Sequence, residues 1–251
     1  MKNILKKIST AMNIITHKSG RPFTSAVILA AGTSTRMNGV SKQMLELSGK
    51  SVIAHTLCSF QNCELIDEII VVTNEVEMPY YDGYFKETYG LTKLSQVVLG
   101  GNTRARSAEN GFSAISKNAD FVAIHDGARC LITPEKISAV VKTAYEKGAA
   151  IAATKSSDTL KKVADDGKIE GTLDRSKIWR AQTPQVFKKN IYFVSLKNCK
   201  NKGSTITDDS MMVEHAGFNV FCVETGSDNI KITTPADIGA ALGIIDGRNG
   251  K

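Results

Sequence analysis

The first apolar run of the sequence is followed by a glycine, by residues with hydroxyl side chains and by two positively charged residues. The run at residues 26–31 leads into Gly32 and a Thr/Ser-rich stretch that contains Arg36, and Lys42 lies a few residues further on. Glycine and small residues let backbone N–H groups approach phosphate oxygens, and nearby cations add charge to such a loop. The spacings G-x-G-x-x-G and G-x-x-x-x-G-K-[ST] are both absent here. The pattern favours a phosphate-binding loop of another kind over a plain connection.

A carboxylate follows another apolar run. Asp126 comes directly after residues 121–125, and a charge has little structural reason to stand at the end of a buried strand. We see no Ser-His-Asp or Cys-His array for nucleophilic catalysis in the sequence. We interpret the neighbouring His125 as packed or hydrogen-bonded, and Cys130 as a buried structural thiol. The chemistry indicated is therefore the binding of phosphate groups, without a covalent intermediate.

Alternating strands and helices are expected to position these residues. We predict strands at residues 26–31, 68–73, 96–99, 121–125, 149–154 and 220–223, and helices at 51–60, 103–116, 188–198 and 208–215 and from residues 134 and 234 onward. This alternation is typical of an α/β, Rossmann-like fold, a mostly parallel sheet flanked by helices. Ligands bind such sheets beyond the carboxyl ends of the strands, which points to the segments that begin at Gly32, Gly100 and Asp126.

The pattern changes at about residues 157–183. Short polar and apolar alternations at 159–163 and 168–170 flank a turn at 165–167, which predicts a protruding β-hairpin. A lone two-stranded hairpin is marginally stable in water, and a second subunit would supply the missing contacts. We therefore predict a homodimer in which this hairpin is the dimerisation arm. Neither a repeat nor a linker divides the chain, so residues 24–251 are expected to form one domain.

The composition narrows the class of partner. A net charge of +7 implies anionic partners, and the basic residues are spread without the aromatic-interleaved clusters of a nucleic-acid groove. Phosphorylated small molecules are therefore favoured, and no nucleic-acid partner is expected. The five cysteines are odd in number and form no C-x-x-C pair, which favours a reducing, cytoplasmic location and gives no metal-ligand spacing.

Residues 1–23 form a separate N-terminal extension. It combines lysines with apolar residues at roughly helical spacing, and it lacks the unbroken apolar core of a secretory signal. A surface-bound amphipathic helix is one interpretation, and a locally packed extension is the favoured one. Because no run of about 18 apolar residues occurs in the sequence, we expect no membrane span.

The motifs taken together resemble a known family. The stretch A-A-G-x-x-x-R-M at 30–37, with Lys42-Gln43, is similar to the signature of nucleotidyltransferases related to the sugar-nucleotide pyrophosphorylases. Later motifs narrow this resemblance to the 2-C-methyl-D-erythritol 4-phosphate cytidylyltransferase family: G-G-N-T-R-A-R-S at 100–107, H-D-G-A-R at 125–129, D-R at 174–175, Q-T-P-Q at 182–185, T-I-T-D-D at 205–209 and D-N-I-K-I-T at 228–233. The resemblance covers about residues 25–245.

The resemblance implies a reaction and its residues. CTP and the phosphorylated sugar alcohol react directly and release pyrophosphate, with Mg²⁺ held mainly through the CTP phosphates and Asp126 as a possible ligand. The implied catalytic residues are Arg36, Lys42, Arg175 and Lys231. The implied CTP-binding residues are Ala30, Ala31, Gly32, Ser34, Arg36, Lys42, Gly101, Asn102 and Ser107, and the implied substrate-binding residues are Asp126, Arg129, Thr159, Arg175, Thr207 and Lys231.

Four positions depart from the family pattern. Asn102 stands where many members have Asp, which predicts a weakened contact with the base. Gly127 and Cys130 interrupt a stretch usually written D-A-A-R-P, and Ser41 replaces a usual proline before Lys42, so we expect looser loops at both places. Two other functions remain open: a ribitol-5-phosphate cytidylyltransferase, and a nucleotide-binding protein without activity.

Overall fold

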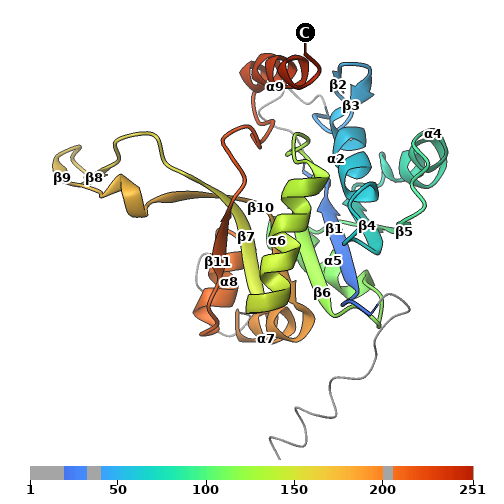
Figure 1. Cartoon of the computed structure of the whole chain (residues 1–251), viewed down its shortest axis with the longest axis horizontal. Coiled ribbons are helices and arrows are strands. Elements are labelled where there is room, and N and C mark those ends of the chain that lie inside the picture. Colours follow the sequence, from blue (N-terminus) through green and yellow to red (C-terminus); the bar gives the residue numbers. More distant parts are fainter. Residues whose placement is uncertain (1–19, 33–40, 200–205, 251) are drawn as a thin grey trace, which may run out of the picture.

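A seven-stranded sheet forms the centre of the computed structural model, which describes residues 20–32, 41–199 and 206–250. The strand order is β11-β7-β10-β6-β1-β4-β5 (Figure 1). The strands are β1 (Thr24–Leu29), β4 (Glu68–Thr73), β5 (Leu94–Leu99), β6 (Phe121–Asp126), β7 (Ala149–Lys155), β10 (Trp179–Lys188) and β11 (Phe221–Glu224). Only β10 runs against its neighbours in this sheet, so the predicted mostly parallel α/β fold is confirmed.

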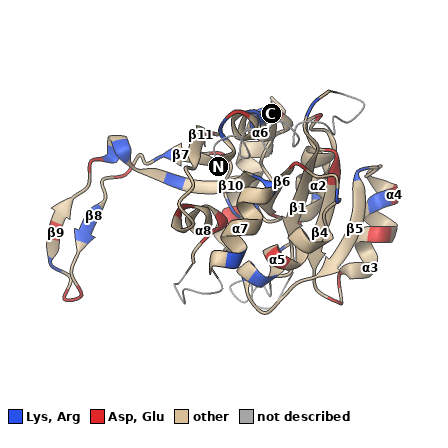
Figure 2. Cartoon of the chain, turned by 90° about the horizontal axis from the view of Figure 1, so that it is seen from below, with Lys and Arg blue, Asp and Glu red and all other residues tan. Residues whose placement is uncertain are grey.

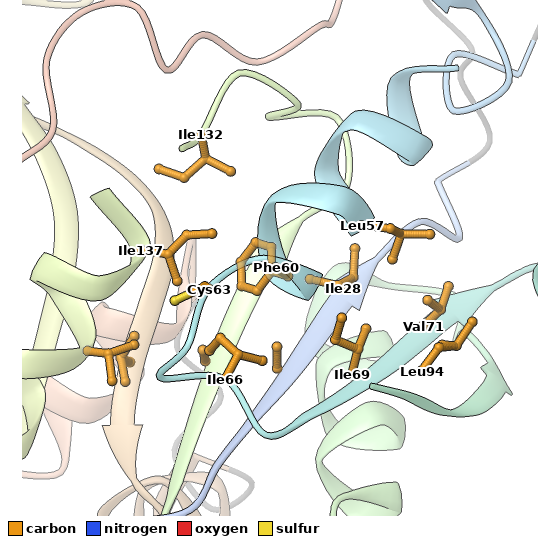
Figure 3. Close-up of a cluster of buried hydrophobic side chains, with 14 of the residues drawn as sticks. Ile28, Leu57, Phe60, Cys63, Ile66, Ile69, Val71, Leu94, Ile132 and Ile137 are labelled. Carbon is orange, nitrogen blue, oxygen red and sulfur yellow. The ribbon is translucent and has the colours of Figure 1, made fainter. Parts of the chain in front are cut away.

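Helices cover both faces of the sheet because successive side chains of a strand point to opposite sides. Ala26 and Ile28 of β1 pack in a core with α2 (Val52–Gln61) and α6 (Pro134–Lys147), part of which Figure 3 shows around Phe60 and Ile137. Val27 and Leu29 pack on the other face. That face is covered by α5 (Arg104–Ala114), α7 (Lys189–Cys199) and α8 (Asp209–His215).

Local sequence signals set the ends of α6. The Thr133 hydroxyl accepts the backbone N–H of Lys136, Pro134 occupies the first turn, and Gly148 follows the helix with a φ of 90°. The Thr133 hydroxyl caps the first turn, and Pro134 stands where the helix needs no backbone N–H. Gly148 tolerates the left-handed backbone that ends the helix. The predicted start at Pro134 is confirmed.

Strand β10 was not predicted, and it separates β6 from β7. Its sequence carries Pro184 in the middle, which normally argues against a central strand because proline cannot donate to the ladder. The pairing with β7 shifts register between Ala181 and Gln185, so Pro184 lies in an irregularity of the ladder. The predicted arm of 157–183 is therefore too long, because Trp179, Arg180 and Ala181 pair with β7.

Several short elements also escaped prediction. They are β2 (Glu46–Leu47), β3 (Lys50–Ser51), α3 (Met78–Tyr80), the π-helical turn Tyr81–Phe85 and α4 (Lys86–Thr88). The last helix, α9 (Pro235–Arg248), packs near β2. No helix within the described ranges is both long and apolar enough to cross a bilayer.

The predicted hairpin is present and projects away from the sheet (Figures 1 and 2). Strands β8 (Lys161–Val163) and β9 (Ile169–Thr172) pair only with each other, and a short 3-10 helix, Arg175–Lys177, follows them. Gly167 has a φ of 87° in the connecting turn, a left-handed conformation that glycine adopts without strain. We use the word arm for residues 156–178.

Candidate active site

A pocket of about 320 Å³ lies beyond the carboxyl ends of β1, β5 and β6, where ligands are expected in such a sheet. Four segments far apart in the sequence meet there. The predicted residues that line it are Ala31, Gly32, Lys42, Gly101, Asn102, Ser107, Asp126 and Lys231. The remaining lining residues are Leu29, Gln43, Thr103, Arg104 and Ala128.

Gly100 lets the segment after β5 approach the segment after β1. A Cβ atom at Gly100 would lie 2.3 Å from the Cβ of Ala31 and 3.0 Å from the hydroxyl oxygen of Ser107. The backbone N–H of Gly101 donates to that hydroxyl at 3.0 Å. Gly100 is therefore needed for the close contact with Ala31, and at Gly101 a Cβ atom would lie 2.2 Å from Cγ of Arg106.

Asp126 is the centre of the charged groups in the pocket. Its carboxylate lies 2.8 Å from Nζ of Lys231, 3.2 Å from Nε of Arg104 and 3.8 Å from Nε of Arg129. Burial alone would raise the pKa of Asp126, but the charges of Arg104, Lys231 and Arg129 outweigh it and hold that pKa well below its usual range. Asp126 is therefore ionised at neutral pH and neutralises part of the positive field.

Arg129 lies behind Asp126 and does not line the pocket. Its side chain is 16% exposed, and Nη1 donates to the backbone oxygen of Asn229 at 2.9 Å. The amide of Asn229 in turn donates to the backbone oxygen of Thr183 at 3.0 Å. In this geometry Arg129 supports the segment that carries Lys231.

His125 is a structural residue, as predicted. It is fully buried, its ring lies 4.8 Å from that of Phe60, and burial lowers its pKa to about 3. The neutral ring donates from Nε2 to the Arg129 backbone oxygen at 3.3 Å, and Nδ1 accepts the Thr183 hydroxyl at 3.1 Å; these partners assign the tautomer. A neutral, buried imidazole at this place is not an acid or base for the reaction.

The departures at Gly127 and Cys130 have packing explanations. Gly127 donates to the backbone oxygen of Leu29 at 2.9 Å and accepts the Thr56 hydroxyl at 2.7 Å. A Cβ there would lie 2.9 Å from Cδ1 of Ile53, so glycine fits a close approach at this residue, and the looser loop stays a prediction. Cys130 is buried, and burial raises the pKa of its thiol to about 12, which agrees with a structural thiol.

Ser41 also has a defined partner. Its hydroxyl donates to the carboxylate of Glu77, and its backbone oxygen accepts the N–H of Met44 at 3.1 Å. Because Glu77 is itself buried, this contact ties the segment before Lys42 to the region that follows β4. The hydroxyl thus supplies an anchor at the place where the family usually has proline.

The other predicted residues lie elsewhere. Ala30 is fully buried and donates to the backbone oxygen of Val72, so it supports the wall without lining it. Thr159 and Arg175 are exposed on the arm. Thr207 lines a neighbouring pocket of about 260 Å³. Ser34 and Arg36 lie outside the described residues, as does most of the predicted N-terminal extension.

Arg104 and Gln43 belong to the pocket and were not predicted as site residues. Arg104 is the first residue of α5, a position where a cation opposes the positive end of the helix dipole. That unfavourable placement was a signal that the sequence contained. Gln43 is buried, and its Oε1 has no hydrogen-bond partner among the described residues, a feature that only the tertiary structure reveals.

The pocket offers little to a metal ion on its own. The described part of the chain contains no group of three or more acidic, histidine or cysteine side chains that could hold one. Among the described lining residues Asp126 is the one carboxylate, and three cations already surround it. These residues do not form a metal cage of their own.

Comparison with known proteins decides the family. The family model described as 2-C-methyl-D-erythritol 4-phosphate cytidylyltransferase matches residues 24–246. The chain belongs to this family. It is therefore a nucleotidyltransferase, and the pocket at the carboxyl ends of β1, β5 and β6 is its candidate active site.

Individual relatives agree with this assignment. The chain is 43% identical to the 2-C-methyl-D-erythritol 4-phosphate cytidylyltransferase of Caldanaerobacter subterraneus over 215 residues, which are 85% of this chain and 95% of the relative. It is 41% identical to the protein of the same name from Bacillus licheniformis, over 88% of this chain and 94% of the relative. Among solved structures, 4-diphosphocytidyl-2C-methyl-D-erythritol synthase from Anaerococcus prevotii superposes with a TM-score of 0.81 at 30% identity, covering 90% of this chain and 96% of that one.

Proposed function

We propose that this chain transfers the cytidylyl group of CTP to 2-C-methyl-D-erythritol 4-phosphate. The products are pyrophosphate and 4-diphosphocytidyl-2-C-methyl-D-erythritol, a precursor in isoprenoid biosynthesis. The observation that carries the proposal is the pocket that Lys42, Gly101 and Lys231 line around an ionised Asp126. Eight of the residues that the family motifs predict for nucleotide and substrate line this pocket, which supports the proposal.

The reaction needs charge stabilisation more than proton transfer. A phosphate oxygen of the alcohol phosphate forms a bond to the α-phosphorus of CTP, and the bond between the α-phosphorus and the bridging oxygen of pyrophosphate breaks. A phosphate monoester is largely ionised at pH 7 because its second pKa is about 6, so no general base is required. Lys42 lines the pocket and is proposed, with Arg36, to stabilise the charge that spreads over the phosphates.

Different parts of the pocket are proposed to bind the two substrates. Gly101, Asn102 and Ser107 on one side, and Ala31 and Gly32 on the other, form the proposed cytosine and ribose contacts. Ala30 supports the second wall, and Ser34 is assigned to CTP from the family motif. The alcohol phosphate is proposed to bind beside Lys231 and Asp126, with Thr207 in the adjoining pocket and Arg129 supporting this region.

The arm provides the argument for a homodimer. Val163 and Ile169 of the two-stranded sheet are 51% and 60% exposed, and Leu173, directly after β9, is 42% exposed; this sheet pairs with no other strand in the described part of the chain. Such a hairpin is marginal in water without further contacts. We propose that a second copy covers it, and that Thr159 and Arg175 of each arm complete the alcohol-phosphate site of the other copy.

Magnesium is proposed to enter with CTP. Because the described residues form no metal cage, the phosphates of the nucleotide would be its main ligands, with Asp126 as the one carboxylate that lines the pocket. When bound, the ion would neutralise phosphate charge. The free thiols of all five cysteines fit a reducing compartment, and we propose a cytoplasmic location.

The test is pyrophosphate release from CTP and Mg²⁺ with 2-C-methyl-D-erythritol 4-phosphate, run beside ribitol 5-phosphate. We expect release with the first substrate alone. Release only with ribitol 5-phosphate would keep the chemistry and replace the substrate. Binding of CTP without release in either reaction would favour a nucleotide-binding protein without activity.

A further inference from the structure

Arg104 stands between two pockets. It lines the candidate active site together with Asp126 and Lys231, and it also lines the neighbouring pocket that contains Thr207. Its side chain is 32% exposed, so it is neither a free surface cation nor a fully buried one. It is the only charged side chain that the described residues contribute to the linings of both pockets.

The guanidinium of Arg104 bridges two carboxylates. Nε donates to Oδ1 of Asp126 at 3.2 Å, and Nη1 donates to Oδ2 of Asp209 at 2.7 Å. The second oxygen of Asp126 accepts Lys231 at 2.8 Å, and the second oxygen of Asp209 accepts the Tyr192 hydroxyl at 2.7 Å. The contacts form one continuous series from the segment after β11, through the end of β6 and the start of α5, to α8 and α7.

Three side chains of the series are buried and depend on their partners. Asp126, Asp209 and Tyr192 are buried, and a buried carboxylate or hydroxyl that loses its partner pays a large desolvation penalty. The planar guanidinium reaches both carboxylates at once, whereas a lysine ammonium is a single point of charge. A shift of Arg104 would therefore displace Asp126 on one side and the Thr207–Asp209 segment on the other.

We propose that Arg104 is a positioning residue. It holds the alcohol-phosphate side of the active site at a fixed position relative to the nucleotide side. Asp209 and Tyr192 act through it, by fixing the far end of the guanidinium. This inference rests on the proposed function, because the quantity that it sets is the placement of Asp126, Lys231 and Thr207 relative to bound CTP.

A purely structural brace is the alternative, and steady-state kinetics separate the two. If Arg104 only stabilises the fold, its replacement lowers the melting temperature and the folded fraction but leaves kcat and KM per folded molecule unchanged. If Arg104 is a positioning residue, its replacement changes kcat and the KM for the alcohol phosphate in fully folded molecules, while the affinity for CTP changes much less. The variants are Arg104→Lys, Asp209→Asn and Tyr192→Phe, the last of which removes only a hydroxyl.

Arg21→Lys is the matched control. Arg21 makes two contacts of 2.8 Å to Asp67, with side chains 28% and 21% exposed, before the starts of β1 and β4 and so at the opposite end of these strands from the pocket. Replacing it removes a comparable bridge and should lower stability without changing the kinetic constants. All measurements are made below the melting temperature, on full-length protein corrected for its folded fraction.

We expect Arg104→Lys and Asp209→Asn to lower kcat/KM for the alcohol phosphate roughly 10- to 100-fold, as small misplacements in active sites do. Tyr192→Phe should lower it about 2- to 10-fold, the range of one hydrogen bond. In the double variant Arg104→Lys/Asp209→Asn, kcat/KM for the alcohol phosphate should be little lower than in the worse single variant, because both substitutions break the same series of contacts. Kinetic constants that match the Arg21→Lys control would overturn the proposal, whereas an inactive wild type would instead overturn the proposed function.

Discussion

The hydroxyl of Thr183 lies 3.1 Å from Nδ1 of His125 and joins the middle of β10 to β6, the strand whose carboxyl end lies at the active site. The same hydroxyl oxygen accepts the backbone N–H of Asp126 at 3.0 Å. Since His125 and Thr183 are both buried, neither group can exchange these partners for water. One side chain of β10 thus fixes both the imidazole tautomer and the backbone of the residue at the centre of the pocket.

Replacing Thr183 should therefore destabilise the fold. Thr183→Val keeps the shape of the side chain but leaves a buried N–H and a ring nitrogen unpaired, so we expect a loss of about 1–3 kcal/mol in the free energy of unfolding. Thr183→Ser restores the hydroxyl and should recover most of that loss. Urea denaturation of the three proteins measures the difference, and equal stability of the Val variant and the wild type would contradict the assigned hydrogen bonds.

The buried His125 predicts a stability that depends on pH. Burial lowers its pKa to about 3, while the unfolded chain protonates near the ordinary value of 6.5. Below pH 6.5 the unfolded state therefore binds a proton that the folded state excludes, and stability falls as the pH drops toward 3. At pH 5 the difference amounts to about 2 kcal/mol.

His125→Gln removes this titration. Urea unfolding at pH 7 and pH 5 should show a smaller decline for the variant than for the wild type, whatever their stabilities at pH 7. Parallel declines in the two proteins would show that His125 is protonated in the folded state at pH 5.

Lys42 should be essential for turnover. Lys42→Ala removes a cation from the pocket, and loss of one preorganised group of this kind lowers turnover by about two to three orders of magnitude. The measurement is the rate of pyrophosphate release at saturating substrates. Lys86→Ala, at an exposed position of α4, is the control and should keep the wild-type rate. A Lys42→Ala protein with near-normal turnover would remove Lys42 from the mechanism.

The proposed shared site predicts complementation between inactive variants. Lys42→Ala would damage the pocket of its own chain, and Arg175→Ala would damage the arm that is proposed to serve the other chain. Mixed in equal amounts, they should form heterodimers with one intact site and recover about a quarter of the wild-type activity. Lys42→Ala mixed with Lys231→Ala should recover none, because both changes lie in the same pocket. Sites made within single chains would give no recovery in either mixture.

Gly127 predicts a compensated pair of substitutions. Gly127→Ala brings a methyl group to 2.9 Å from Cδ1 of Ile53 and 3.1 Å from the backbone oxygen of Leu29, and such overpacking costs about 1–3 kcal/mol. Ile53→Val removes Cδ1 and alone costs about 0.5–1.5 kcal/mol. The double variant should be more stable in thermal denaturation than the sum of the single changes predicts. Additive losses would mean that the Leu29 backbone contact dominates.

Much of this architecture could be predicted from local sequence. The apolar runs at residues 68–73 and 121–125 form buried strands because each is long enough to cross a sheet and is covered on both faces. Thr133, Pro134 and Gly148 delimit α6 through interactions within a few residues. The ordered motifs from residue 30 to residue 233 indicated the family, which the comparisons confirmed.

Strand β10 shows what local sequence does not contain. Its proline and polar residues read as a turn. The strand forms around them because β7 pairs with residues 179–181 and 185–187 and β6 pairs with residues 185–188. Propensity is weak compared with two ladders of hydrogen bonds and a buried face. The same placement brings Thr183 onto Asp126, a contact between residues 57 positions apart.

Some residues of the pocket could be identified from the sequence, and the role of others appears only in the tertiary structure. Lys42, Asp126 and Lys231 were identifiable because their types and motifs indicate phosphate chemistry. The bridging role of Arg104 was not, since it depends on Asp209, 105 positions away in the chain. Sequence determined which groups are present and which elements carry them. Tertiary structure decided which charges meet, because burial and distance set the strength of an ion pair and neither can be measured along the chain.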